Sequence, residues 1–168
     1  MAYNFEILTR QRLAVILYSG QLARSEFDEV WQGLHQSSKF DWNFDEIALF
    51  GPDAELANLN FEKVGEVAKK FAVTHGKVEV SHARRVAIVV SNQVQVIGAR
   101  MFLAFIAANP PPNMEIKLFG KVSAALTWIE EGRPPGDPGR QIDNAEVERT
   151  LSELDEARRK ALGERRAG

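Results

Sequence analysis

Hydrophobic residues near the start of the chain fall into two short runs that are typical of β-strands. Apolar and polar residues alternate in NFEILT, residues 4–9, as expected of a strand with one buried face. The run from Leu13 to Leu17 is apolar without interruption, which indicates a strand covered on both faces. A polar turn at residues 10–12 separates the two runs, so we predict a β-hairpin.

Farther along the chain, strand-like apolar runs alternate with segments of helical spacing. Three more strands are predicted in DEIALF, RRVAIVV and MEIKLF, at residues 45–50, 84–90 and 114–119. Apolar residues recur three and four positions apart in four segments, at residues 25–36, 61–71, 94–108 and 122–132. The order β-β-α-β-α-β-α-β-α predicts an α/β fold, with a sheet that is mostly parallel after the N-terminal hairpin and with helices packed on it.

The helix predicted from Val94 to Ala108 is apolar on nearly every side, although one apolar face is enough to pack on a sheet. One stripe contains Ile97, Met101, Ala104, Phe105 and Ala108, and the side chains that spread beyond it are Phe102, Leu103 and Ile106. We expect this second group to be buried by another copy of the chain, by the C-terminal helix, or by both. A neighbouring helix of the same domain and an apolar ligand are the alternative covers.

A segment rich in proline and glycine, residues 132–142, separates the predicted sheet domain, residues 1–131, from a charged C-terminal segment, residues 143–168. Proline stiffens such a linker. The C-terminal segment keeps an apolar stripe among residues of both charges, so we expect an amphipathic helix that docks on the domain or on another copy. The stripe consists of Val147, Leu151, Leu154, Ala161 and Leu162.

Composition narrows the classes of function. The formal net charge of −2 gives no broad field that would attract nucleic acid or an anionic membrane. The chain has no cysteine, which excludes disulfides, thiolate nucleophiles and cysteine-ligated zinc. No apolar run reaches the roughly 20 residues that span a bilayer, and the N-terminus lacks the pattern of a signal peptide. We therefore expect a cytoplasmic protein that neither spans a membrane nor binds nucleic acid.

The residues that could carry catalysis or bind a metal do not form a recognisable motif. The spacing of the histidines matches no zinc site; they are His35, His75 and His82. Four acidic residues bracket the third predicted strand without a spacing that fixes a partner for acid–base work; they are Asp41, Asp45, Glu46 and Asp53. The turn before the apolar helix lacks the glycines of a phosphate-binding loop. We predict no catalytic residue, no cofactor and no metal, and Trp42 is the aromatic residue to test for binding.

Two stretches of the chain resemble the bacterial STAS-like domains, the relatives of anti-sigma-factor antagonists. They are RRVAIVVSNQVQVIGARMF and MEIKLFGKVSAALTWIEEG. The similarity is closest to the branch grouped with the CRAL-TRIO lipid-transfer fold, and the matching positions are Gly98, Ala99, Arg100, Met101, Phe102, Ala125 and Trp128. The resemblance covers about residues 3–131 and implies the same α/β fold, but its loose packing motifs carry less information about function.

The resemblance implies a regulatory protein. In antagonists of sigma regulation, a phosphorylatable Ser or Thr lies where the central strand meets the next helix. The corresponding residues 51–60 contain neither, so the sequence offers no acceptor for that switch. We predict a non-enzymatic regulatory or protein-interaction domain that forms a homodimer, with a regulatory protein as a further candidate partner. The alternative is a carrier or sensor of a small apolar ligand or lipid. The candidate interaction residues are Ile97, Met101, Phe102, Leu103, Phe105, Ile106, Leu151 and Leu154.

Overall fold

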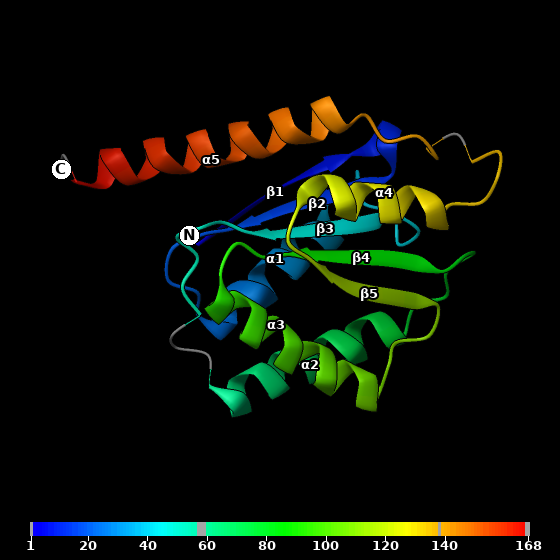
Figure 1. Ribbon diagram of the computed structural model, residues 1–168, viewed down its shortest axis with the longest axis horizontal. Helices are drawn as coiled ribbons and strands as arrows, with labels where there is room; N and C mark the ends of the chain where they lie inside the picture. Colours follow the sequence, from blue (N-terminus) through cyan, green and yellow to red (C-terminus); the bar gives the residue numbers. More distant parts are fainter. Residues whose placement is uncertain (1, 57–59, 138, 167–168) are drawn as a thin grey trace.

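The structure is a computed structural model that describes residues 2–56, 60–137 and 139–166, with side chains described as far as residue 161. Within these residues five strands form one mixed sheet, and five α-helices pack on it (Figure 1). This arrangement confirms the predicted α/β fold. Within the same residues, no helix combines the length and the apolar character needed to cross a membrane.

The strands lie in the sheet in the order in which they occur along the chain. β1 and β2 pair antiparallel, and every later pair is parallel. The strands are β1 (Tyr3–Leu8), β2 (Leu13–Tyr18), β3 (Asp45–Phe50), β4 (Arg84–Val89) and β5 (Met114–Phe119). A short 3-10 helix, Thr9–Gln11, turns the chain between β1 and β2, and Arg12 closes it in the left-handed region with φ 50°. The predicted hairpin and the parallel pairing after it are confirmed.

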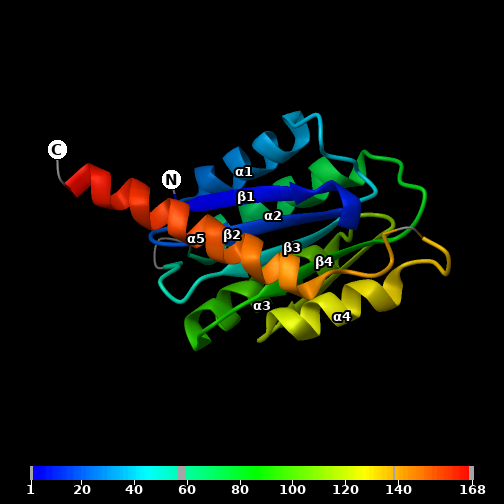
Figure 2. The ribbon, with the colours of Figure 1, turned by 90° about the horizontal axis from the view of Figure 1, so that it is seen from above.

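Three helices connect the parallel strands and cover one face of the sheet. They are α1 (Arg24–Gln36), α2 (Phe61–Gly76) and α3 (Gln93–Ala108). Because consecutive strands are neighbours and such crossovers are right-handed, all three helices lie on the same side. Two further helices, α4 (Val122–Gly132) and α5 (Asn144–Arg166), cover the opposite face, as Figures 1 and 2 show.

The sheet therefore separates two apolar cores. The first lies under α1, α2 and α3, and the second lies under α4 and α5. Strand β2 serves both, since Ala14 and Ile16 point into the first core while Leu13 and Val15 point into the second. All four side chains are fully buried. This explains why the sequence of β2 is apolar without alternation.

Helix α5 lies across β1 and β2, on the side of the sheet opposite to α3 (Figure 2). Its residues Val147, Leu151 and Leu154 are buried in the second core. The prediction that the C-terminal helix covers Phe102, Leu103 and Ile106 is therefore wrong. The reason is that the N-terminal hairpin presents an apolar face that the α5 stripe covers. Of the other predicted stripe positions, Ala161 is exposed and the side chain of Leu162 lies outside the described residues.

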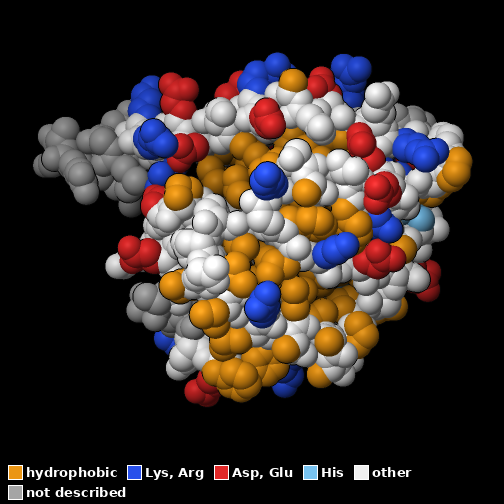
Figure 3. All heavy atoms as spheres, viewed as in Figure 1, with side chains coloured by type: hydrophobic (Ala, Val, Ile, Leu, Met, Phe, Trp, Pro, Cys, Tyr) orange, Lys and Arg blue, Asp and Glu red, His pale blue; other side chains and the backbone are white. Residues whose placement is uncertain are grey.

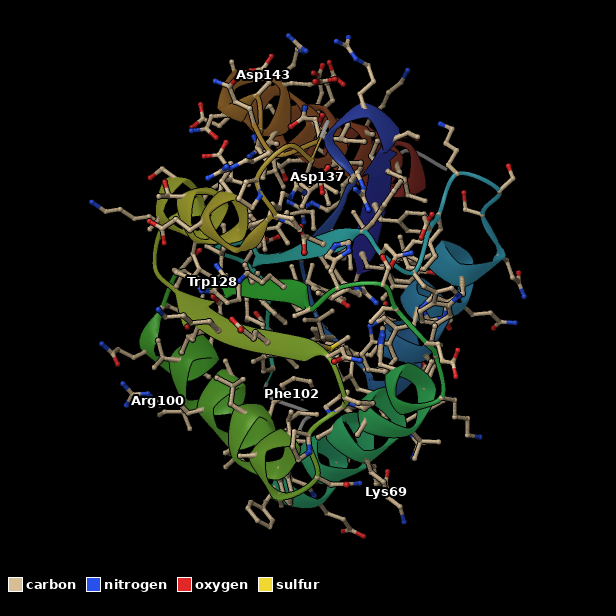
Figure 4. All side chains as sticks on the ribbon, turned by 90° about the vertical axis from the view of Figure 1, so that its right-hand side faces the viewer. Lys69, Arg100, Phe102, Trp128, Asp137 and Asp143 are labelled. Carbon is tan, nitrogen blue, oxygen red and sulfur yellow. The ribbon has the colours of Figure 1, made fainter. Side chains whose placement is uncertain are left out.

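The segment between α4 and α5 is held against the sheet by ion pairs. Arg12 Nη1 donates to Asp137 Oδ2 at 2.8 Å, and Figure 4 shows Asp137 beside the N-terminal hairpin. Arg133 Nε donates to Asp45 Oδ2 at 2.8 Å, with both side chains almost fully buried. The proline-rich segment thus follows a course fixed by contacts with distant parts of the chain.

Candidate functional site: an apolar chamber and an exposed helix face

A cavity of about 80 Å³ lies between the sheet and the layer of α1, α2 and α3. We call it the chamber. Alternate residues of β3 and β4, such as Ala48 and Ile88, line it on the sheet side, and Phe27 and Phe71 line it on the helix side. One buried water needs roughly 10–15 Å³, and an apolar cavity of ~150 Å³ admits benzene. The chamber therefore has room for a ligand of a few heavy atoms, but a lipid requires a larger space.

Gln95 on α3 is one of the few polar residues that line the chamber, and only 1% of it is exposed. Its Nε2 donates to the carbonyl oxygens of Gly51 at 2.8 Å and Ala54 at 3.1 Å. Its Oε1 accepts from the backbone N–H of Ser91 at 2.7 Å. Gln95 thus ties the segment after β3 to the beginning of α3. Leu56, in that segment, also lines the chamber.

Glu46 is the acidic residue of the chamber lining, and it forms an ion pair inside the first core. Its Oε2 accepts from Nη2 of Arg84 at 3.3 Å, and 4% and 1% of the two side chains are exposed. Burial raises the pKa of Glu46 and lowers the pKa of Arg84, while their mutual attraction opposes both shifts. Since guanidinium remains charged in proteins, the pair is ionic and depends on both partners.

His75 on α2 completes this buried cluster. Nη1 of Arg84 donates to its Nδ1 at 3.2 Å, because a guanidinium only donates, and the imidazole is therefore neutral. Burial, and then the charge of Arg84, lower the pKa of His75 to about 2. Within the described residues, His75 Nε2 and Arg84 Nε are buried without a hydrogen-bond partner. The cluster thus holds a neutral His75 beside the charged guanidinium of Arg84.

The four acidic residues around β3 do not converge on one point. Successive residues of a strand point to opposite faces, so Glu46 lies in the first core while Asp45 binds Arg133 on the other face. Asp41 accepts from the backbone N–H of Asn43 within its own turn. Asp53 pairs with Arg158 of α5 at 2.5 Å. Each carboxylate has a separate partner, and none of these pairs forms an acid–base couple around a shared space.

The remaining predicted candidates are also separated. His35 is half-buried against Trp42, with ring centroids 4.1 Å apart. The centroid of the Trp42 ring lies 5.7 Å from that of His75, so the three rings form one cluster. His82 lies apart from them, beside Ser81. In the part of the chain that the structure describes, no group of three or more His, Cys, Asp or Glu residues could hold a metal ion. Asn92, in the turn before α3, caps this helix: its Oδ1 accepts from the backbone N–H of Gln95 at 3.0 Å.

The outward face of α3 is apolar and uncovered. Val94 is 63% exposed and Ile97 is 60% exposed, and Phe61 at the beginning of α2 is 66% exposed. Hydrophobic side chains gather over the lower half of the molecule in Figure 3, where Figure 1 places α2 and α3. Leaving a large apolar side chain in water forgoes roughly 1.5–3 kcal/mol relative to burial. An exposed group of this kind is typical of a contact surface.

The two faces of α3 are the reverse of the predicted arrangement. Ile106 is buried in the first core, and Phe102 packs edge-on against Phe71 with ring centroids 5.6 Å apart. Figure 4 shows Phe102 between the helices and the sheet, whereas Arg100 points away. Phe102, Leu103 and Ile106 thus pack within the domain. Ile97 and Met101 lie on the side that faces away from the sheet.

Of the other interaction candidates, Phe105 is partly buried and packs against the first core. Leu151 and Leu154 are buried in the second core. The Phe105 ring approaches Gly65 of α2 so closely that a side chain there would meet it at 3.0 Å. Two residues in or beside the chamber were missed: Gln95 lines it, and Arg84 pairs with the lining residue Glu46. Gln95 is a polar residue in an apolar helix, and Arg84 is a charge at the edge of the most apolar strand. A polar residue among apolar ones was the signal available for Gln95, whereas Arg84 stands next to Arg85 and gave no such signal.

Comparisons of the chain with protein-family models, with curated proteins and with solved structures gave no match.

Proposed function

We propose that this chain is a non-enzymatic, STAS-like domain that acts by protein–protein contact in regulation, and that the outward face of α3 is its contact surface. The proposal includes self-association and a cytoplasmic location. The observation that carries it is the exposure of Val94 and Ile97, at 63% and 60%, on a helix whose single charged residue is Arg100. A surface with so little charge favours a partner that offers apolar area.

A photoreactive residue at position 97 tests the contact surface directly. Ile97 is replaced by p-benzoylphenylalanine, and the producing cells are irradiated before denaturing electrophoresis. We expect a covalent adduct heavier than the monomer. The matched control carries the same photoreactive residue at Ala157, which is exposed on α5 on the other side of the sheet. Equal yields at the two positions, or no adduct at position 97, would contradict the proposal.

The chamber supports a second candidate function, a carrier or sensor of a small apolar ligand. It is lined mostly by apolar side chains and has a volume of about 80 Å³. Extraction of the purified protein with organic solvent, followed by mass spectrometry, should then release a small molecule that a blank lacks. Ala99→Leu fills the chamber from α3 and should abolish the signal. An extract of the wild-type protein that equals the blank removes this candidate.

A further inference from the structure

Five residues form a continuous apolar strip along the outward side of α3. They are Val94, Ile97, Met101, Ala104 and Ala108, and we call them the α3 strip. Met101 is half-buried and the other four are exposed. Their alternating spacing of three and four residues is that of the seam of a coiled coil. The strip lies on the side of the helix opposite to the buried Ala99 and Ile106.

The strip has no charge to attract a charged partner. Arg100, the single charged residue of α3, is exposed and borders the strip, because it lies three residues after Ile97 and four before Ala104. Charged groups placed against the five strip residues themselves would lose their hydration without gaining a partner. The complementary surface is uncharged and apolar, and a second copy of the chain presents one.

The sizes of the side chains make the strip complementary to itself when it is inverted. Its first half carries the larger residues Val94 and Ile97, and its second half carries Ala104 and Ala108. An antiparallel pair of α3 helices places the large half of one against the small half of the other. A parallel pair would set large against large and leave a gap at the alanines. Twofold symmetry gives the antiparallel arrangement in a single closed dimer.

We propose that two copies of this chain associate through their α3 strips, antiparallel, with the twofold axis passing near Met101. This inference rests on the proposed function and names its partner. Val94 then lies opposite Ala108 of the second copy, and Ile97 lies opposite Ala104 and Phe105 of the second copy. Phe61 lies beside the part of the contact that contains Phe105, since the centroids of the two rings are 4.8 Å apart.

The area of the strip shows which size class of interface it can form. α3 has 16 residues. At 1.5 Å per residue it is about 24 Å long, and with a width of about 10 Å it offers roughly 240 Å² per copy. Two copies give about 480 Å², below the roughly 1,000 Å² of a typical stable interface. The strip alone therefore makes a weak, reversible contact, and the exposed Phe61, whose ring lies beside that of Phe105, is positioned to extend it.

Single cysteines map the arrangement, because the chain has none of its own. Under mild oxidation, Met101→Cys should form a disulfide-linked dimer, since the two residues meet at the axis. Val94→Cys and Ala108→Cys should each remain monomeric alone and should cross-link when mixed. Ala157→Cys on α5 is the background control. Cross-linking of Val94→Cys with itself indicates a parallel pair and overturns the proposal, as does a yield for Met101→Cys no higher than the control.

Sedimentation velocity over a range of concentrations measures the association without cross-links. Ile97→Glu should weaken it on the order of tenfold or more, because it places a carboxylate in an apolar contact. Ala157→Glu should have no effect, and circular dichroism should show both variants folded, since both side chains are exposed. A wild-type protein that stays monomeric at all concentrations overturns this inference.

The results for the dimer and for the proposed function are separable. A monomeric protein that still gives an adduct with another protein at position 97 in cells removes self-association but retains protein–protein contact through the outward face of α3. The absence of both the dimer and the adduct removes both.

Discussion

Glu46 and Arg84 pair across neighbouring parallel strands, with Oε2 and Nη2 3.3 Å apart in the first core. Arg84→Met leaves a buried carboxylate without its cation, and we expect it to lower the free energy of unfolding by about 3–5 kcal/mol. Glu46→Gln should do the same by leaving the guanidinium unpaired. The double variant should recover most of the loss, because neither charge remains. Urea unfolding followed by circular dichroism gives the four values. A double variant as unstable as the sum of the single ones contradicts this account.

The buried His75 should make the fold sensitive to acid. Its pKa in the folded state is about 2, below the ordinary 6.5, so the unfolded chain binds a proton that the folded chain excludes. The stability from this group is complete above about pH 6.5 and is lost as the pH falls towards 2. The slope reaches at most about 1.4 kcal/mol per pH unit. His35 acts in the same direction, and Glu46, with a raised pKa, acts in the opposite direction.

His75→Asn isolates this contribution, because its amide oxygen can still accept from Arg84. Urea midpoints at pH 7, 6 and 5 should fall less steeply in the variant than in the wild type. The difference between the two slopes belongs to His75, since the other titrating groups are common to both proteins. Parallel slopes would show that the residue does not titrate on unfolding.

Gln95 should control the opening of the segment after β3. Gln95→Leu leaves the carbonyl oxygens of Gly51 and Ala54 without its donor, and the N–H of Ser91 without its acceptor. A buried polar group without a partner costs about 1–3 kcal/mol. Hydrogen exchange should therefore accelerate at residues 51–56 and remain slow in β4. Gln93→Leu, at an exposed position of the same helix, is the control and should change neither.

The second core should depend on α5. Leu151→Ala removes a side chain that is 7% exposed and should cost about 2–5 kcal/mol of unfolding free energy. Glu153→Ala, on the exposed side of the same helix, should stay within about 0.5 kcal/mol of the wild type. Urea unfolding measures both. Equal stabilities for the two variants would mean that α5 does not contribute to the folded core.

The strands were predictable because their patterns are local. The unbroken run from Leu13 to Leu17 correctly indicated a strand with two covered faces, and the apolar run that begins at Val86 belongs to β4, an interior strand of the sheet. The candidate site was harder to predict from the sequence. The sequence of a helix that is apolar on nearly every side does not indicate which face packs on the sheet. The orientation of α3 depends on Gln95, which donates to carbonyl oxygens 41 and 44 residues away. The course of the proline-rich segment depends on Arg12, 125 residues from Asp137. Contacts at such separations leave no local pattern.

The sequential order of the strands has a consequence for folding during synthesis. Each new strand joins the edge formed by the strand before it, so the sheet and its α1–α3 layer can assemble as the chain leaves the ribosome. The other face of β2 cannot be finished then, because Leu13 and Val15 are covered only when Val147 and Leu151 emerge. A nascent chain with a nearly complete sheet therefore shows an apolar face to its surroundings, and that interval is when it is open to chaperones and to aggregation.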